Sequence, residues 1–159
     1  MRIDLAKPLL PGQSISFQIK WWYNINDRMQ VGGRSGYEYF ETDQNYLYTI
    51  AQFFPRMCVY NDVTGWQNKQ FLGRGEFTLP FGDYEVSLTV PADHVVAATG
   101  ECQNYASILS AEQRKRYELA KKSNSPVLIV TQAEAEAAEK NKSTQTKTWI
   151  YKATNVRDF

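Results

Sequence analysis

The chain has little of the side-chain chemistry on which metal sites depend. Its 159 residues include one histidine, His94, and only two cysteines, Cys58 and Cys102. A zinc site built from this chain would need carboxylates for nearly all its ligands, which is uncommon. The two cysteines are too few for a disulfide scaffold and lack metal-binding spacing. We therefore predict two buried thiols, a surface or sheet-edge histidine, and no metal cofactor in this chain.

The chain also lacks an excess of charge of one sign and any long apolar run. Eighteen basic residues against seventeen acidic residues give a formal charge of +1. Nucleic acid or an anionic membrane surface would require a dense positive field. No apolar run approaches the ~20 residues of a transmembrane helix. The first eleven residues lack the basic, apolar and small-residue parts of a secretory signal. We predict neither nucleic acid nor membrane as a partner.

What the chain does have is the composition of one globular domain, residues 1–159, with 43% hydrophobic and 22% charged residues. Apolar and polar residues alternate over residues 13–25, which predicts a half-buried β-strand. β-branched and aromatic composition predicts further strands. They are expected at residues 37–40, 46–51, 56–60, 75–79, 84–90, 95–99, 127–130 and 146–152.

Two helices are predicted in the second half of the chain. Ser110 with Gln113, and Thr131 with Glu134, have the spacing of reciprocal capping boxes at helix starts. The alanine and glutamate that follow are strong helix formers. We therefore expect a helical excursion at about residues 108–142. The predicted fold class is mainly β, an antiparallel β-sandwich or saddle-like sheet with a helical insertion.

Three patterns that could carry chemistry have plainer explanations. Glu76 and Glu85 could oppose one another across a hairpin like the carboxylates of a glycosidase, but such residues commonly serve solubility. The glycine loops "VGGRSG" and "GRGEF" precede strand-like sequence, whereas a phosphate loop precedes a helix, so both are interpreted as turns. Basic residues of the first predicted helix alternate with Glu112 and Glu118, as on a solvated face.

Aromatic residues are frequent, at 14% of the chain. An exposed row of them could stack on sugar rings, as in carbohydrate-binding modules. Core packing is the favoured interpretation, because Trp21 shares the apolar side of its predicted strand and only Trp22 interrupts the polar side. The alternative function is an independent carbohydrate-binding β-sandwich module that uses exposed Trp22 or Trp66.

Residues 46–101 resemble the amino-terminal β-domain of the aminopeptidase N family of zinc metallopeptidases, particularly a bacterial branch. That family carries a "TQFEP…R…FPCFDEP" region, a strand that ends in "VP", and a segment like "SNG". Residues 51–55 match "QF-P", Val90 and Pro91 match "VP", and Thr99 and Gly100 match the close of the last segment. The resemblance implies a β-domain that lines a peptide cleft.

Residues 147–159, "KTWIYKATNVRDF", resemble the family pattern "W-x-F-x-x-x-x-V-R-D-F-A", which leads into the catalytic domain. The matching residues are Trp149, Tyr151, Val156, Arg157, Asp158 and Phe159. The resemblance implies that the chain is truncated before its catalytic domain and packs against that domain in a full-length parent. Peptide substrate would be bound only in that context. Truncation also predicts self-association through exposed sheet edges.

The family's catalytic signature, H-E-x-x-H with a downstream glutamate, and its G-A-M-E-N substrate loop do not occur in the sequence. The two histidines of that signature hold zinc, and its glutamate activates water. The resemblance therefore implies a zinc aminopeptidase as the parent and no activity in this chain alone. Relatives in this branch are often exported, which favours a periplasmic or secreted parent.

One residue could still reach the substrate. In relatives, the glutamine of "TQFEP" projects toward the amino end of the bound substrate, where an amide can hydrogen-bond a charged amine. Gln52 is the matching residue, although Ile50 and Ala51 stand where a threonine is usual. The resemblance implies a substrate-binding role for Gln52. The alternative is an ordinary loop glutamine.

Overall fold

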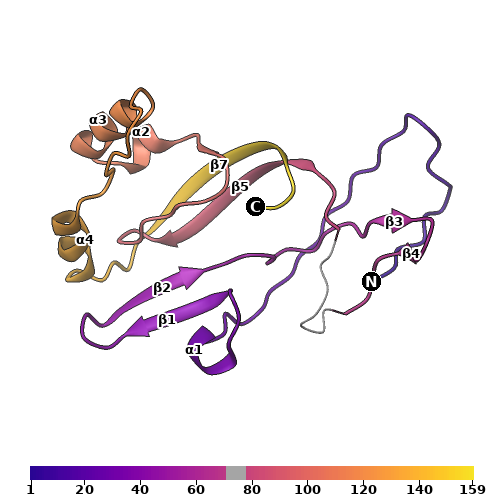
Figure 1. The fold of residues 1–159 in the computed structure, drawn as a ribbon, viewed down its shortest axis with the longest axis horizontal. Coiled ribbons are helices and arrows are strands. Elements are labelled where there is room, and N and C mark those ends of the chain that lie inside the picture. The colour runs from indigo at the N-terminus through magenta and orange to yellow at the C-terminus, as the bar shows by residue number, and fades with distance from the viewer. Residues whose placement is uncertain (71–77) are drawn as a thin grey trace.

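The computed structural model describes residues 1–70 and 78–159. Its strands are β1 (Gly36–Phe40), β2 (Asn45–Thr49), β3 (Tyr60–Asn61), β4 (Gly65–Trp66), β5 (Gly82–Pro91), β6 (Glu101–Cys102) and β7 (Thr146–Val156). Its helices are α1 (Arg28–Val31), α2 (Tyr105–Ile108), α3 (Ala111–Ala120) and α4 (Gln132–Glu139) (Figure 1). The strands form three small antiparallel sheets, β1-β2, β3-β4 and β5-β7-β6. The antiparallel strands predicted at residues 37–40, 46–51, 84–90 and 146–152 and the helical insertion are confirmed, in a mixed arrangement of small sheets and helices rather than a clear β-sandwich.

The β5–β7 pair is the longest ladder in the described structure, and its two faces differ as the sequence alternation requires. Leu88 lies opposite Trp149 and Val86 opposite Tyr151, so apolar side chains share one face. The other face is mostly polar, with Ile150 opposite Ser87 as an apolar exception. There the hydroxyls of Thr89 and Thr148 lie 2.8 Å apart. This amphipathic ribbon is the platform on which the core is built.

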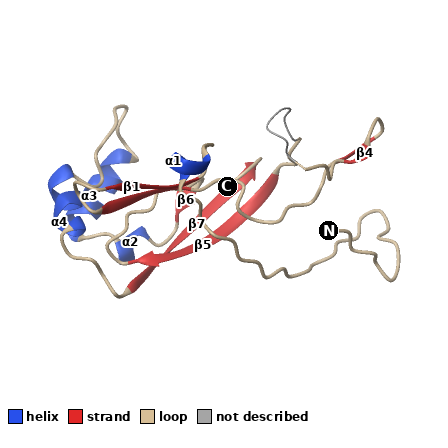
Figure 2. Ribbon diagram, turned by 90° about the horizontal axis from the view of Figure 1, so that it is seen from below, coloured by secondary structure: helices blue, strands red, loops and turns tan. Residues whose placement is uncertain are grey.

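A small core lies on the apolar face of that ribbon. Cys102, Leu109, Trp149 and Tyr151 are buried together, and Trp149 is only 4% exposed. The hydroxyl of Tyr151 donates to the carbonyl oxygen of Val96 at 2.8 Å, which satisfies its polar end. Figure 2 shows α2, α3 and α4 gathered at one end of the sheets, with α1 apart from them. The helical segment between β6 and β7 therefore covers part of the core.

The two cysteines differ in their environments. Cys102 is buried, as predicted, and burial raises the pKa of its thiol. Cys58 is only half-buried, so the prediction of burial is wrong for this residue, and both thiols are free. A protonated, buried thiol is unreactive, which makes Cys102 a packing residue.

The capping boxes form as predicted. The Ser110 side chain accepts from the Gln113 amide, and Thr131 pairs in the same way with Glu134. Arg116 of α3 then donates to both carboxylate oxygens of Glu134, one of them at 2.6 Å. This forked ion pair joins α3 to the start of α4, and it holds the pKa of Glu134 at about 2.

The depressed pKa of Glu134 predicts how stability depends on pH. A carboxyl group with a lower pKa in the folded state stabilises the fold above its unfolded pKa. The contribution is lost as the pH falls toward about 2. Glu134→Gln should therefore lower the melting temperature at pH 7 and lower it much less at pH 3, measured by circular dichroism. Glu136→Gln, which loses only a local bond from Gln132, is the control. An equal shift at both pH values would contradict the ion-pair explanation.

Several predicted strands are not formed. Residues 13–25 contain no strand, and residues 95–99 and 127–130 are irregular, whereas only Tyr60 of residues 56–60 is in a strand. Of the predicted strand at residues 75–79, residues 75–77 lie outside the described residues and the other two are irregular. A strand is defined by hydrogen bonds to a neighbour, and alternation supplies only the side-chain pattern. Apart from the end of residues 56–60, which pairs with β4, these segments have the pattern without a paired strand among the described residues.

Candidate functional site

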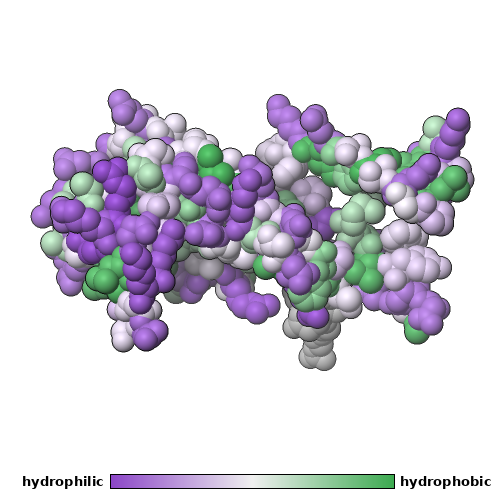
Figure 3. All heavy atoms as spheres, turned by 90° about the horizontal axis from the view of Figure 1, so that it is seen from above, coloured by the Kyte–Doolittle hydropathy of each residue, from purple (hydrophilic) through white to green (hydrophobic). Residues whose placement is uncertain are grey.

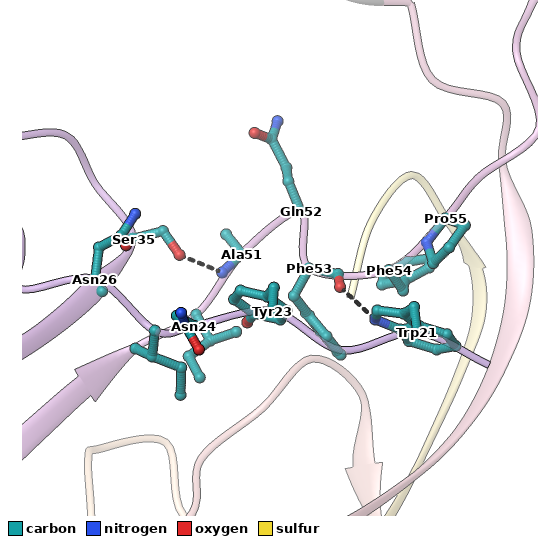
Figure 4. A pocket seen from close by; sticks show the side chains of 13 residues that line it. Trp21, Tyr23, Asn24, Asn26, Ser35, Ala51, Gln52, Phe53, Phe54 and Pro55 are labelled. Atoms are coloured by element: carbon teal, nitrogen blue, oxygen red, sulfur yellow. Dashed lines mark hydrogen bonds between the residues drawn. The ribbon is translucent and has the colours of Figure 1, made fainter. Parts of the chain in front are cut away.

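Gln52 lies in the irregular segment that follows β2 and precedes Pro55. Its φ angle is +54°, in the left-handed region that non-glycine residues rarely adopt. Such a conformation costs of order 1 kcal/mol and is often found at functional sites. Figure 4 shows the Gln52 side chain projecting away from its neighbours. Its amide makes no hydrogen bond to any residue that the structure describes, so it is free to meet another molecule.

Gln52 stands at the edge of a groove of about 440 Å³ between two extended segments (Figure 4). One segment contributes Trp21 and Tyr23, and the other contributes Phe53 and Phe54. The remaining lining residues are Asn24, Ile25, Asn26, Ser35, Gly36, Ile50, Ala51, Gln52 and Pro55. The lining combines aromatic rings with amides and a hydroxyl and includes no charged side chain. A groove with this lining suits an uncharged part of a ligand, such as a peptide backbone or an apolar side chain.

Four hydrogen bonds hold the walls of the groove together. The indole Nε1 of Trp21 donates to the carbonyl oxygen of Phe53 at 2.9 Å, which links the two segments. Ser35 donates to the Thr49 carbonyl and accepts from the Ala51 amide, both at 3.2 Å. The Tyr37 amide donates to the Asn26 carbonyl at 2.9 Å. Sequence reasoning missed Ser35, because a serine beside a glycine carries no signal of a contact that is distant in sequence.

Arg56, which follows the lining residue Pro55, is bonded to residues outside the groove. Its guanidinium donates to Asp158 at 2.9 Å and to the Pro80 carbonyl at 3.1 Å, and it lies over the Phe54 ring at 5.6 Å. Asp158 belongs to the segment that resembles the family's exit pattern. The ion pair is partly buried and joins two segments that are distant in sequence. It therefore fixes the position of residues 53–56 beside β5.

His94 has a local partner. Its Nδ1 lies 3.3 Å from the carboxylate of Asp93, and its ring lies 5.9 Å from the ring of Tyr48. Burial favours a higher pKa for Asp93, but hydrogen bonds from His94 and the Ser143 amide outweigh it and lower this pKa. The Cys102 thiol donates to Asn104 instead, at 3.7 Å. His94 and Asp93 therefore form a local structural pair.

The other candidates are also accounted for. Glu85 pairs with Lys152 at 3.0 Å, and Glu76 lies outside the described residues. "VGGRSG" links α1 to β1 as a turn, with Gly32 as the helix cap, whereas "GRGEF" lies outside the described residues. Lys115 of the basic cluster pairs with Glu112 at 2.8 Å on the surface of α3. These residues take structural roles.

Three of the four tryptophans are more exposed than core packing predicts. Trp21 is 45% exposed, Trp66 is 57% exposed and Trp22 is 87% exposed. The prediction that Trp21 is a core residue is therefore wrong. Its segment has no second layer packed over it among the described residues, so only the indole edge that meets Phe53 is held.

No group of three or more histidine, cysteine, aspartate or glutamate side chains is arranged to hold a metal within residues 1–70 and 78–159. The side chains in those ranges therefore do not fit a zinc site. Helices in the same ranges are too short or too polar to cross a membrane. No protein-family model matches the chain, and comparisons with curated proteins and with solved structures found no match.

Proposed function

We propose that the chain is a non-catalytic β-rich scaffold of an aminopeptidase-N-like zinc metallopeptidase. In this role it packs against a separate catalytic domain, which holds the zinc, and lines one side of the peptide cleft. The resemblance of residues 46–101 and 147–159 motivates the assignment. Packed against that catalytic domain, the three small sheets would be joined into the saddle-like or sandwich arrangement expected for such a domain.

The observation that best supports a packing role is the amount of apolar surface left uncovered. Large apolar side chains are exposed along the amino-terminal segment and on β1 and β2, and Figure 3 shows hydrophobic residues at the surface in both halves of the molecule. The exposed set outside residues 14–25 includes Leu10, Tyr39, Phe40 and Leu47. Monomeric proteins rarely leave large contiguous apolar surfaces open to water. A partner domain would cover them.

Gln52 is the proposed contact with the substrate. Its amide has no partner among the described residues, its backbone is held in an unfavourable conformation, and the adjoining groove is uncharged. An amide can accept a hydrogen bond from the amino group of a peptide without neutralising its charge. Strain maintained at a residue whose side chain makes no hydrogen bond among the described residues is consistent with a binding role.

Complementation tests this function. The chain would be mixed with the catalytic domain of an aminopeptidase N from which the amino-terminal domain has been removed, and turnover of an aminoacyl-nitroanilide measured. We expect the chain alone to be inactive and the mixture to be active. Gln52→Gly should raise KM about tenfold, the effect of losing roughly 1.4 kcal/mol of binding. It should also raise thermal stability, because glycine relieves the left-handed strain.

Gln67→Ala is the control for that experiment, because its amide lies outside the groove. Chelator-sensitive turnover by the chain alone would overturn the non-catalytic assignment. An unchanged KM in Gln52→Gly, with restored activity, would leave the scaffold role intact and overturn the role of Gln52.

Trp22 and Trp66 support a second candidate function, carbohydrate binding. Both are more than half exposed, and the Trp66 ring packs edge-on against Tyr60 with centroids 5.2 Å apart, which leaves an aromatic surface in the β3-β4 hairpin. Such rings can stack on sugars. Retention on an immobilised glycan that is lost in Trp66→Ala, with no complementation of a catalytic domain, would favour this function over the scaffold.

A further inference from the structure

Residues 14–25 form an extended segment whose backbone is unpaired. None of their amides or carbonyls takes part in a backbone hydrogen bond to another described residue, and none has a positive φ angle. Figure 1 shows them as a long indigo trace that leads to α1. Unpaired amides and carbonyls in an extended segment are a template for another strand.

The side chains of this segment also have the properties of a strand that needs a partner. Phe17 is 50% exposed, and Ile15, Trp21, Tyr23 and Ile25 of the same alternating set are each more than one third exposed. Lys20 is the one charged residue between residues 13 and 26, and this stretch contains no proline. High β-propensity with low charge is the composition that pairs readily with its own copy.

The carboxyl end of the segment is fixed in place. Trp21 is bonded to the Phe53 carbonyl, the Asn26 carbonyl accepts from the Tyr37 amide, and Asp27 forms an isolated β-bridge with Tyr37. Because these contacts already limit the freedom of the segment, a strand that pairs with it loses less conformational entropy on binding.

We propose that residues 14–25 pair antiparallel with the same residues of a second copy, so that two chains form a dimer across a continuous two-stranded ribbon. A twofold interface must be self-complementary. With Ile19 on the twofold axis, Ile19 lies opposite Ile19, Phe17 opposite Trp21, and Ile15 opposite Tyr23. Gln18 then lies opposite Lys20, so no like charges meet.

Other registers are less favourable. An axis at Lys20 places two lysines opposite one another, and like charges directly across a ladder are destabilising. A twofold axis that passes between two residues places each apolar side chain opposite a polar one, so neither face of the ribbon is apolar. An axis at Trp21 leaves residues 14–16 without partners. The register centred on Ile19 keeps the apolar set on one face over the greatest length.

Cysteine cross-linking tests this register. In a Cys58→Ser background, with Cys102 buried and unreactive, Ile19→Cys should place two thiols across the axis within disulfide reach. We expect Ile19→Cys to form a covalent dimer at least tenfold faster than Ile15→Cys under mild oxidation, as seen on non-reducing gels. Ile15→Cys is the matched control, because its partner is residue 23.

Sedimentation without cross-linking provides a second measurement. The unmodified chain should sediment as a concentration-dependent dimer, and Ser16→Pro, which removes one backbone donor at an exposed position, should weaken dimerisation at least tenfold. Val63→Pro in the exposed turn between β3 and β4 is the control. A monomer at all concentrations, or equal cross-linking at residues 15 and 19, would overturn the proposal. If Ser16→Pro left the dimer unchanged, the two chains would pair through another strand edge, such as that of β5, and the proposal would be wrong. None of these outcomes depends on the complementation experiment.

Discussion

Gly100→Ala is expected to destabilise the fold by about 3 kcal/mol, which is a large share of the stability of a small domain. Gly100 has a φ angle of +87°, and a Cβ atom built there would overlap the carbonyl oxygen of Lys152 and lie 2.8 Å from the Cβ atom of Ala153. The left-handed conformation costs alanine about 1 kcal/mol, and the overlap with backbone atoms adds about 2 kcal/mol. Urea unfolding followed by tryptophan fluorescence measures the change.

Gly33→Ala separates the two causes. Gly33 has a φ angle of +100°, yet nothing lies within 4 Å of the position that its Cβ atom would take. Gly33→Ala should therefore lose only the stability that the left-handed backbone conformation costs alanine, about 1 kcal/mol. Equal losses in the two variants would show that the close approach of the loop to β7 contributes nothing.

Asn104→Ala should lower the free energy of unfolding by about 2–3 kcal/mol. The Asn104 side chain makes hydrogen bonds to the backbone of β7 that a neighbouring strand would otherwise make. Its Oδ1 accepts from the Ile150 amide and its Nδ2 donates to the Thr148 carbonyl, both at 2.9 Å. β6 itself pairs with β7 at only two positions, Lys152 and Tyr151. The Asn104 amide extends that short ladder along β7, and its loss leaves two partly buried backbone groups unsatisfied.

Two further variants make the Asn104 result specific. Asn104→Asp keeps the acceptor but sets a carboxylate oxygen against the Thr148 carbonyl, so it should not recover the stability lost in Asn104→Ala in the same urea titration at pH 7. Gln103→Ala removes a side chain that donates only to the nearby Glu101 carbonyl, and it should change stability by less than about 0.5 kcal/mol. Similar losses for Asn104→Ala and Gln103→Ala would contradict the role of Asn104 as a strand substitute.

Together, Gly100 and Asn104 explain how β7 becomes a central strand. β5 covers one edge of β7 along nearly its whole length. The other edge is covered by a two-residue strand, a glycine close to the β7 backbone, and an asparagine side chain. This arrangement buries Trp149 and Tyr151 beneath the excursion while using very little regular sheet.

The features of the fold that were predictable from the sequence are those set by local interactions. Ser110 and Thr131 cap their helices because the cap and its partner are three residues apart. The strands of the β1-β2 hairpin and of the β5–β7 pair were also predicted closely, although residues 146–152 extend in the structure to Val156. In both pairs, a segment with alternating side chains has a neighbouring strand with which its backbone forms hydrogen bonds.

The candidate site was predictable only in part. The position of Gln52 came from a resemblance in a short motif, and its unfavourable backbone conformation was not visible in the sequence. The groove beside it depends on the Trp21–Phe53 and Ser35–Ala51 contacts, which join residues far apart in the chain. Loop closure of this kind leaves no periodic pattern in a sequence.

The sequence by itself determined the helix starts, the alternating faces of β5 and β7, and the shortage of metal ligands in this chain, because each depends on residue type and short spacing. Only the tertiary structure decided which alternating segments became strands. Residues 13–25 and 84–90 both alternate, but β5 has β7 beside it, whereas residues 14–25 have no backbone partner among the described residues. A strand is a property of two neighbouring segments, and one segment's sequence specifies only its own half of the ladder.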